Sequence, residues 1–323
     1  MKKCVRCGKE FADELTTCPS DGYALEPSGG SKTLPVNTPP AHYGEVNQTQ
    51  SAPPIVSGLG NSSNSNIPLD RLRDPKEMQA LMWLHVASVP AFILFAVWTI
   101  SSLGIPLILT GFLFLVTAFG ELFFSAYLRT NAIRASEHQL PELFHAAQEG
   151  ARKLGMECPE IYVLQHNVWN AFATRIFGRR MVVLFSGAVD SILLKGDVEQ
   201  LSWVIGHELG HHWAGHFTFK QKLARWGGWL VWVNLWHSRR RELTCDRVGL
   251  YCSGSLKSAR LAMLNLTAGA QLAAKANPDA AIAQWQQHRG EFFVKYRTLY
   301  SSYPHLLARL ENLELSAREF GMS

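Results

Sequence analysis

The sequence lacks a long run of charge of one sign and a dense cysteine framework. Its 323 residues carry a formal net charge of +5, yet Lys and Arg are scattered among acidic residues. Nucleic-acid binding is therefore not predicted, and the modest positive excess suits an anionic membrane surface better. Six cysteines, three grouped and three scattered, lack the even spacing of a secreted disulfide-bonded domain, which favours a reducing compartment. No apolar stretch follows the basic start, so we expect no cleavable signal peptide.

Residues 1–26 contain the segments CVRCG and TTCPSDG, the two-knuckle layout of a small zinc ribbon. Three thiolates would bind a zinc ion there: Cys4, Cys7 and Cys18. A fourth cysteine is missing, so either Asp21 binds through oxygen or the site is degenerate. The alternative to a ribbon is a short disordered arm with reduced thiols. Residues 27–69 are rich in Pro, Ser, Asn, Thr and Gly and predict a disordered linker, because they cannot bury enough apolar surface to offset their ordering entropy.

Residues 81–128 are predicted to form a transmembrane helical hairpin. The only charged or imidazole side chains between its ends are His85 and Glu121, and the apolar run breaks once, at 101–106. Each arm is about 20 residues long, the length at which an α-helix crosses a hydrocarbon core. Basic residues flank both outer ends and none lies in the turn, so the positive-inside rule predicts a multi-pass protein of the cytoplasmic membrane with the rest of the chain in the cytoplasm. The alternative is a buried helical hairpin in a soluble core.

The remainder, residues 136–323, has the pattern of a soluble α+β domain. A helix is expected over 141–154, followed by strands at 161–164 and 181–185. Another helix begins near Asp197, because a Gln three residues later completes a pattern like a capping box and an apolar helical period follows. After Ser258 the chain is again helical to its end, so we expect a mainly helical domain with a small β-sheet.

The segment HELGH at 207–211 has the pattern of a zinc-peptidase helix. On a helix, His207 and His211 are one turn apart and face the same way, as two imidazoles must to share one zinc ion. Glu208 lies beside them, placed to take a proton from zinc-activated water and pass it to the leaving amine. The metzincin pattern is excluded, because the next Gly and the third His, His216, each fall one place off its register.

The third metal ligand is expected in the segment SRRRELTCDR at 238–247. Glu242 and Asp246 are one helical turn apart on one face. Glu242 can complete a His, His, Glu site that leaves the fourth position for water. Asp246 can then accept the free N–H of a zinc-bound histidine, preferably His207, and fix its tautomer and orientation. The alternative is that both carboxylates belong to a solvated charged face together with the neighbouring arginines.

Together these motifs resemble the HtpX-like zinc peptidases, integral-membrane gluzincins related to the prenyl (CAAX) proteases. The resemblance covers residues from about 139 to 316. It rests on five segments in the order of the family: WNAFA (169–173), VVLFSGAVD (182–190), HELGH, SRRRELTCDR and SSYPHLLARL (301–310). It implies a zincin-like fold and internal cleavage of membrane or misfolded proteins. It also implies zinc bound by His207, His211 and Glu242, with Glu208 as the catalytic base.

Two further roles follow from the resemblance. WNAFA would lie beside the active-site cleft, where Asn170, Ala171 and the adjacent backbone pair with an extended substrate as an added strand. Relatives usually have a His before the Pro of the late motif, where this chain has Tyr303. The Tyr303 hydroxyl could donate to the developing oxyanion, with His305 or Arg309 as rivals. The structural alternative has the Pro starting a helix and Arg309 paired on its surface.

Relatives with four membrane spans carry two of these spans between the HELGH-type motif and the Glu ligand. In this chain only residues 217–241 lie between the two motifs. Four tryptophans recur there every three or four positions, at 226, 229, 232 and 236, with basic residues at the ends. This predicts either an amphipathic stretch that dips into the membrane interface or a buried core helix. Cys245 is interpreted as a small buried core residue, and His212, His216 and His237 as structural or surface residues.

We therefore expect a membrane-anchored zinc metalloendopeptidase acting on protein or peptide substrates, with the lipid bilayer as its other partner. The rival hypothesis is a membrane scaffold or protein-binding module whose zinc site is structural or silent. An intact Glu208 argues against the rival, because a structural site does not require a base. The sequence does not identify the substrate, the role of the amino-terminal arm or the oligomeric state.

Overall fold

The structure is a computed structural model that describes residues 2–4, 10–12, 25–27, 67–193 and 196–322. The chain divides into two units, Met1–Gly60 and Asn61–Ser323. In the first unit, β1 (Lys2–Cys4) pairs antiparallel with β2 (Glu10–Phe11) on one side and with β3 (Leu25–Pro27) on the other. Cys7 and Cys18 lie outside the described residues, as does most of the expected linker, so the ribbon and the linker stay predictions.

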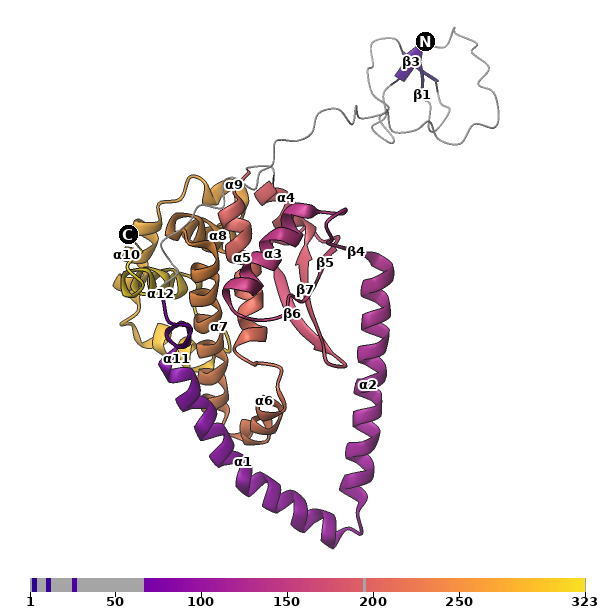
Figure 1. The fold of residues 1–323 in the computed structure, drawn as a ribbon, viewed down its shortest axis with the longest axis vertical. Helices are drawn as coiled ribbons and strands as arrows, with labels where there is room; N and C mark the ends of the chain where they lie inside the picture. The colour runs from indigo at the N-terminus through magenta and orange to yellow at the C-terminus, as the bar shows by residue number, and fades with distance from the viewer. Residues whose placement is uncertain (1, 5–9, 13–24, 28–66, 194–195, 323) are drawn as a thin grey trace. The chain divides into compact units, whose positions relative to one another are not determined.

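Two long apolar helices extend from the rest of the second unit (Figure 1): α1 (Pro75–Ser101) and α2 (Ile105–Asn131). Helix α1 begins where the Asp74 side chain accepts a hydrogen bond from the Lys76 N–H, and the turn uses Gly104 with φ of +85°. Both helices are long and apolar enough to cross a membrane. The most apolar window of α2 has no buried residue and that of α1 is 28% buried, which is not the pattern of a core hairpin in a soluble protein.

A four-stranded sheet follows the hairpin, with strand order β4-β5-β7-β6. Its strands and the helix that packs on them are β4 (Ala132–Arg134), α3 (Pro141–Lys153), β5 (Glu160–Leu164), β6 (Ala171–Ile176) and β7 (Arg179–Phe185). The central pair β5 and β7 is parallel, and the outer pairs are antiparallel. The apolar run at the centre of β7 is fully buried, as expected for an interior strand. Strand β6 lies at the edge of the sheet.

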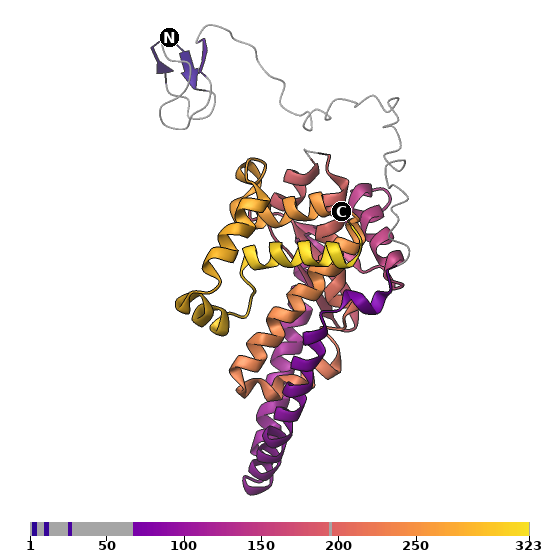
Figure 2. The ribbon, with the colours of Figure 1, turned by 90° about the vertical axis from the view of Figure 1, so that its left-hand side faces the viewer.

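Helices form the rest of the unit (Figure 2). They are α4 (Ser186–Leu193), α5 (Val198–Trp213), α6 (Phe219–Ala224), the 3-10 helix η4 (Arg225–Trp229), α7 (Val231–Ser253), α8 (Leu256–Ala268), α9 (Ala270–Ala273), α10 (Pro278–His288), α11 (Phe292–Tyr300) and α12 (Leu306–Glu319), after an initial 3-10 turn η3 (Leu69–Leu72). The predicted fold class is confirmed: a mainly helical domain with a small mixed sheet follows two apolar helices.

Helices α5 and α7 pack against each other at backbone distance. A Cβ added at Gly206 would lie 2.6 Å from Cys252 Cβ, and one at Gly210 would lie 3.0 Å from Cys245 Cα. Any side chain at these positions would force the helices apart. The glycines therefore bring the HELGH segment of α5 directly against the higher-numbered half of α7, beside the turn that carries Glu242 and Asp246.

Two local expectations are corrected by the structure. The Asp197 side chain caps α5 by accepting from the Gln200 N–H at 2.7 Å, but the Gln200 side chain has no hydrogen-bond partner among the described residues. Only half of the capping box is therefore formed. The four tryptophans do not share one amphipathic helix: two lie on η4 and two on α7, and the helical run breaks between them at Leu230, whose ψ is 72°.

Candidate metal centre

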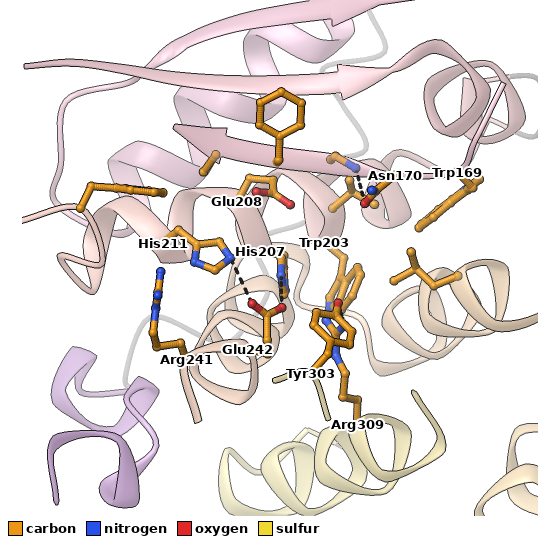
Figure 3. Close-up of a pocket in the computed structure, with 16 residues that line it drawn as sticks. Trp169, Asn170, Trp203, His207, Glu208, His211, Arg241, Glu242, Tyr303 and Arg309 are labelled. Carbon is orange, nitrogen blue, oxygen red and sulfur yellow. Dashed lines mark hydrogen bonds and ion pairs between the residues drawn. The ribbon is translucent and has the colours of Figure 1, made fainter. Parts of the chain in front are cut away.

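The two histidines of HELGH face a carboxylate of α7 (Figure 3). Nε2 of His207 lies 3.5 Å from one Glu242 oxygen, and Nε2 of His211 lies 3.8 Å from the other. Both distances are longer than a normal hydrogen bond. The three side chains thus surround a common point without closing on one another, as ligands around an ion would.

The opposite ring nitrogen of His207 faces a buried carboxylate. Nδ1 of His207 lies 3.0 Å from Asp246 Oδ1, and Asp246 is fully buried. Arg309 of α12 holds both oxygens of Asp246, with Nε at 2.8 Å from one and an Nη at 2.6 Å from the other. Such a bidentate pair fixes the plane of the carboxylate and so the ring orientation of His207. The expected alternative of a surface pairing for Arg309 is wrong, because this side chain is 1% exposed.

The opposite ring nitrogen of His211 faces His216. The two Nδ1 atoms lie 2.9 Å apart, and Nε2 of His216 lies 3.0 Å from Glu77 on α1. Sequence reasoning left His216 among the structural or surface residues and did not single out Glu77. No spacing rule could have found this contact, since 139 residues separate the two positions.

Cys245 competes with Glu242 as a third ligand. Its sulfur lies with ring nitrogens of His207 and His211 in a group whose atoms are within 4.8 Å of one another. The thiol is fully buried, and burial raises its pKa well above the ordinary value, which opposes the thiolate that zinc requires. Its sulfur also lies 3.9 Å from Nδ1 of His216, the nitrogen that faces Nδ1 of His211. Glu242, which faces both Nε2 atoms, is therefore the better third donor.

Glu208 is 6% exposed and lies beside the two histidines, with its Oε2 lacking a hydrogen-bond partner among the described residues. The backbone of Ala173 on β6 hydrogen-bonds this carboxylate. Burial raises the pKa of Glu208 to about 7, which suits a group that must exchange protons near neutrality. A buried carboxylate oxygen that has no partner among the described residues and belongs to a side chain beside the two histidines is what a general base for bound water would present.

The electrostatics of the site favour a cation. Burial lowers the pKa of His207, but Asp246 and Glu242 more than offset this and raise it to about 9. Burial likewise opposes ionisation of Glu242, yet His207 and His211 hold its pKa below the ordinary value. The residues present therefore fit a zinc ion: two imidazoles and one carboxylate are the donors of a catalytic site with an open fourth position.

A cavity of about 280 Å³ opens over these residues. Its lining includes Asn170 and Ala171 at the start of β6, and Tyr303 and Arg309 on the other side. The Asn170 side chain accepts from the Ala171 N–H at 2.9 Å and so fixes the beginning of the edge strand. The cleft therefore has the metal ligands at its base and a strand edge along one wall.

Tyr303 is the oxyanion-donor candidate that lines this cavity with its ring accessible. Its hydroxyl accepts a hydrogen bond from Arg309, whose guanidinium lies 4.7 Å from the ring centroid. His305 instead contacts Thr298 at 2.9 Å and lies outside this cavity lining. The expectation that Pro304 starts a helix is wrong, because α12 begins at Leu306 with His305 as its cap.

Comparison with known proteins finds similarity to peptidases. The model of peptidase family M48 matches residues 134–226. The resemblance to the HtpX-like peptidases of this family is confirmed. Several proteins named "Protease HtpX homolog" are similar: that of Thermodesulfovibrio yellowstonii is 32% identical over 30% of this chain and 36% of its own length, and that of Pyrococcus furiosus is 25% identical over 59% and 79%.

A plant protein is also similar to this chain. The plastoglobule-localized metallopeptidase 48 of Arabidopsis thaliana, a chloroplastic protein, is 26% identical over 47% of this chain. The chain spans 48% of this relative and 36% of the Thermodesulfovibrio protein, about half of their length or less. No solved structure matches the chain.

Proposed function

We propose that the chain is a membrane-anchored zinc metalloendopeptidase that hydrolyses peptide bonds of membrane or misfolded proteins. The observation that carries this proposal is the convergence of the His207, His211 and Glu242 donor atoms beside the unpartnered oxygen of Glu208. A structural zinc site needs four protein ligands and no base, whereas a catalytic site needs three ligands and a base next to the open position. The similar proteins named as proteases agree with the second arrangement.

The residues of the cleft divide the work of hydrolysis. A zinc ion held by the three donors would supply a Lewis acid that polarises the scissile carbonyl and activates water. Glu208 accepts the proton of the attacking water and passes it to the leaving amine. The Tyr303 hydroxyl accepts from Arg309 and so keeps its own proton free to donate to the oxyanion. Asp246, held by Arg309, keeps His207 in the required orientation.

The edge strand β6 provides a binding surface for the substrate. Among the described strands it pairs with β7 alone, and its residues Ala171 and Ala173 line the cleft. An extended peptide can add to such an edge through main-chain hydrogen bonds, which read no sequence and suit unfolded substrates. Asn170 Oδ1 accepts from the Ala171 N–H, and the backbone of Ala173 hydrogen-bonds Glu208. Asn170 thus fixes the start of the strand, and we expect the remaining backbone groups of this edge to meet the peptide.

The tryptophan segment, residues 226–236, supports membrane attachment. The Trp229 indole donates to the carbonyl of Ala87, and the Trp226 ring stacks on Phe92 at 4.7 Å. At 1.5 Å per residue, Ala87 lies about 9 Å along α1 from the expected start of the span at Leu81. With the span beginning at Leu81, the segment would pack against α1 at the depth of the bilayer. Three of its indoles are exposed and would then face lipid: Trp226, Trp229 and Trp232.

Substitution of the base tests the enzymatic proposal. The full chain, purified in detergent and supplied with zinc, should cleave an unfolded protein such as casein. Glu208→Gln should lower the rate by about two orders of magnitude or more while zinc content stays unchanged, because a general base contributes on that scale. Glu199→Gln, an exposed change on the same helix, is the matched control and should leave cleavage intact. Equal cleavage by Glu208→Gln and the unaltered chain would contradict the mechanism.

The rival hypothesis, a scaffold with a silent zinc site, makes the opposite prediction. Such a protein would bind zinc with the same three ligands and yet show no cleavage that depends on Glu208. Proteins trapped by the Glu208→Gln variant in cells would distinguish the two, since an enzyme retains uncleaved substrates that the unaltered chain releases as fragments.

A further inference from the structure

His211 is one of the two proposed imidazole ligands. A series of polar contacts links its Nδ1, the ring nitrogen that does not face Glu242, to the first helix of the hairpin. Its Nδ1 lies 2.9 Å from Nδ1 of His216, and Nε2 of His216 lies 3.0 Å from Glu77 Oε1. The His216 side chain and that of Glu77 are both fully buried. Water therefore does not replace these contacts, and each polar atom depends on the next.

The chemistry of a histidine ligand fixes the direction of each hydrogen bond that links His211, His216 and Glu77. A zinc ion takes the lone pair of His211 Nε2, so the proton of that ring must lie on Nδ1. His211 Nδ1 then donates to His216 Nδ1, which leaves the His216 proton on Nε2. His216 Nε2 donates in turn to the carboxylate of Glu77. One arrangement of protons thus satisfies all three groups, and it is the arrangement that metal binding requires.

Glu77 is itself held in place by the residues just before α1 and by a residue of α7. Thr244 of α7 donates its hydroxyl to Glu77 Oε2, and Arg73 donates to Oε1 at 2.9 Å. The backbone N–H of Asp74 donates to Thr244 at 3.0 Å. These contacts lock the first turn of α1 to the helix that carries Glu242, and a buried carboxylate with three donors is well satisfied.

We propose that Glu77, acting through His216, is a positioning residue of the metal centre, so that the first membrane helix supplies part of the zinc site. The inference rests on the proposed zinc function and adds a second support to it. His207 is oriented by Asp246 and Arg309 from within the domain, whereas His211 is oriented by His216 and Glu77 from the anchor. The two ligands of one motif thus depend on different parts of the chain.

Zinc affinity of the full chain in detergent tests this inference, measured by competition with a chromophoric chelator. His216→Leu removes the acceptor for His211, and Glu77→Leu removes the acceptor for His216. Each should weaken zinc binding about 10- to 100-fold, the usual effect of losing such an outer contact. His216→Asn and Glu77→Gln retain a hydrogen-bonding group and should show smaller losses. The visible spectrum of the cobalt-substituted protein should change in the two Leu variants, which a loss of stability alone would not cause.

His212→Leu is the matched control. His212 is a buried histidine on α5, the helix of His211. Its Nε2 contacts the Met181 carbonyl at 3.1 Å, so it takes no part in the contacts that link His211, His216 and Glu77. This variant should lower stability and leave the zinc affinity of the folded protein unchanged. If the Leu variants do not fold, His216→Asn and Glu77→Gln decide: zinc affinity equal to that of the unaltered chain in both would overturn the proposal. Failure of the unaltered chain to bind zinc would instead contradict the proposed function itself.

Discussion

Arg309 and Asp246 form a buried ion pair whose partners cannot be removed separately without cost. Both side chains are at most 1% exposed, and two hydrogen bonds join them. Removing one partner leaves the other charge buried without compensation, which typically costs 3–5 kcal/mol. The pair therefore stabilises the fold only as a unit, and its geometry serves the ring of His207.

Arg309→Met should lower the free energy of unfolding by about 3–5 kcal/mol for this reason. Urea unfolding of the detergent-solubilised chain, followed by tryptophan fluorescence, measures the change. Arg260→Met is the control, because Arg260 pairs with Glu314 and Asp279 near the surface and such pairs contribute about 0–1 kcal/mol. Equal losses of unfolding free energy in the two variants would show that the buried Arg309–Asp246 pair stabilises the fold no more than the pairs of Arg260 do.

His212 and His237 predict a loss of stability in acid. Burial lowers the pKa of each to about 4 from an ordinary value of 6.5. Below 6.5 the unfolded chain binds protons that the folded chain excludes, so stability is complete above that pH and falls as the pH drops toward 4. Each group contributes on the order of 1–3 kcal/mol to this fall.

The test compares unfolding free energies at pH 7 and pH 5 in the presence of a chelator. His237→Gln removes one of the two groups and should make the difference between the two pH values smaller than in the unaltered chain. His237 is suitable because it lies outside the proposed ligand set and its Nε2 has no hydrogen-bond partner among the described residues. An unchanged pH dependence in the variant would be inconsistent with a neutral buried His237.

At the residue scale, the sequence predicts what local spacing determines. His207, His211 and Glu208 lie within five positions, and Glu242 and Asp246 within one helical turn, so helix geometry alone groups them. The roles of His216 and Glu77 could not be predicted, because their contact depends on where α1 packs. A buried glutamate near the start of an apolar helix has no distinguishing pattern in the sequence.

At the scale of elements, Gly227 lets the tryptophan segment dock on α1. A Cβ at this position would lie 2.0 Å from the carbonyl oxygen of Leu84, whereas one at Gly228 would meet its nearest atom at 3.9 Å. Gly227→Ala should therefore destabilise the fold by about 1–3 kcal/mol, as overpacking does, and Gly228→Ala should be close to neutral. Thermal unfolding measures both.

Lipid contact provides a second readout for the same pair of variants. In liposomes containing brominated lipids, Gly227→Ala should alter the quenching of tryptophan fluorescence, because the segment no longer packs against the span. Gly228→Ala should resemble the unaltered chain. Identical quenching and stability in both variants would contradict docking of η4 on α1.

Elements with a strong period were predictable and edge elements were not. The expected helix over 141–154 and the strands at 161–164 and 181–185 agree with α3, β5 and β7 within a few residues. Strands β4 and β6 were not expected as strands. Both lie at the edges of the sheet and are partly exposed. Strand β4 has only three residues, and β6 (AFATRI) contains Thr and Arg, so neither shows a continuous apolar run.

At the scale of the whole molecule, the expected topology is testable. With both outer ends of the hairpin in the cytoplasm, the turn between α1 and α2 should face the other side of the membrane. A membrane-impermeant thiol reagent should label Ser102→Cys in intact cells, and should label Gly290→Cys only after permeabilisation. The unaltered chain gives the background from its own cysteines. The reverse labelling pattern would invert the proposed orientation.

The hairpin is attached to the domain at both of its outer ends. Helix α1 joins through Glu77 and His216, while α2 runs directly into β4, and its Phe124 contacts Phe172 of β6 at 6.2 Å between ring centroids. A domain tethered at one point could swing and reach segments at many heights above the bilayer. Attachment at both ends instead favours one height for the cleft. Under the proposed function, cleavage would then occur where a substrate's unfolded segment passes that level.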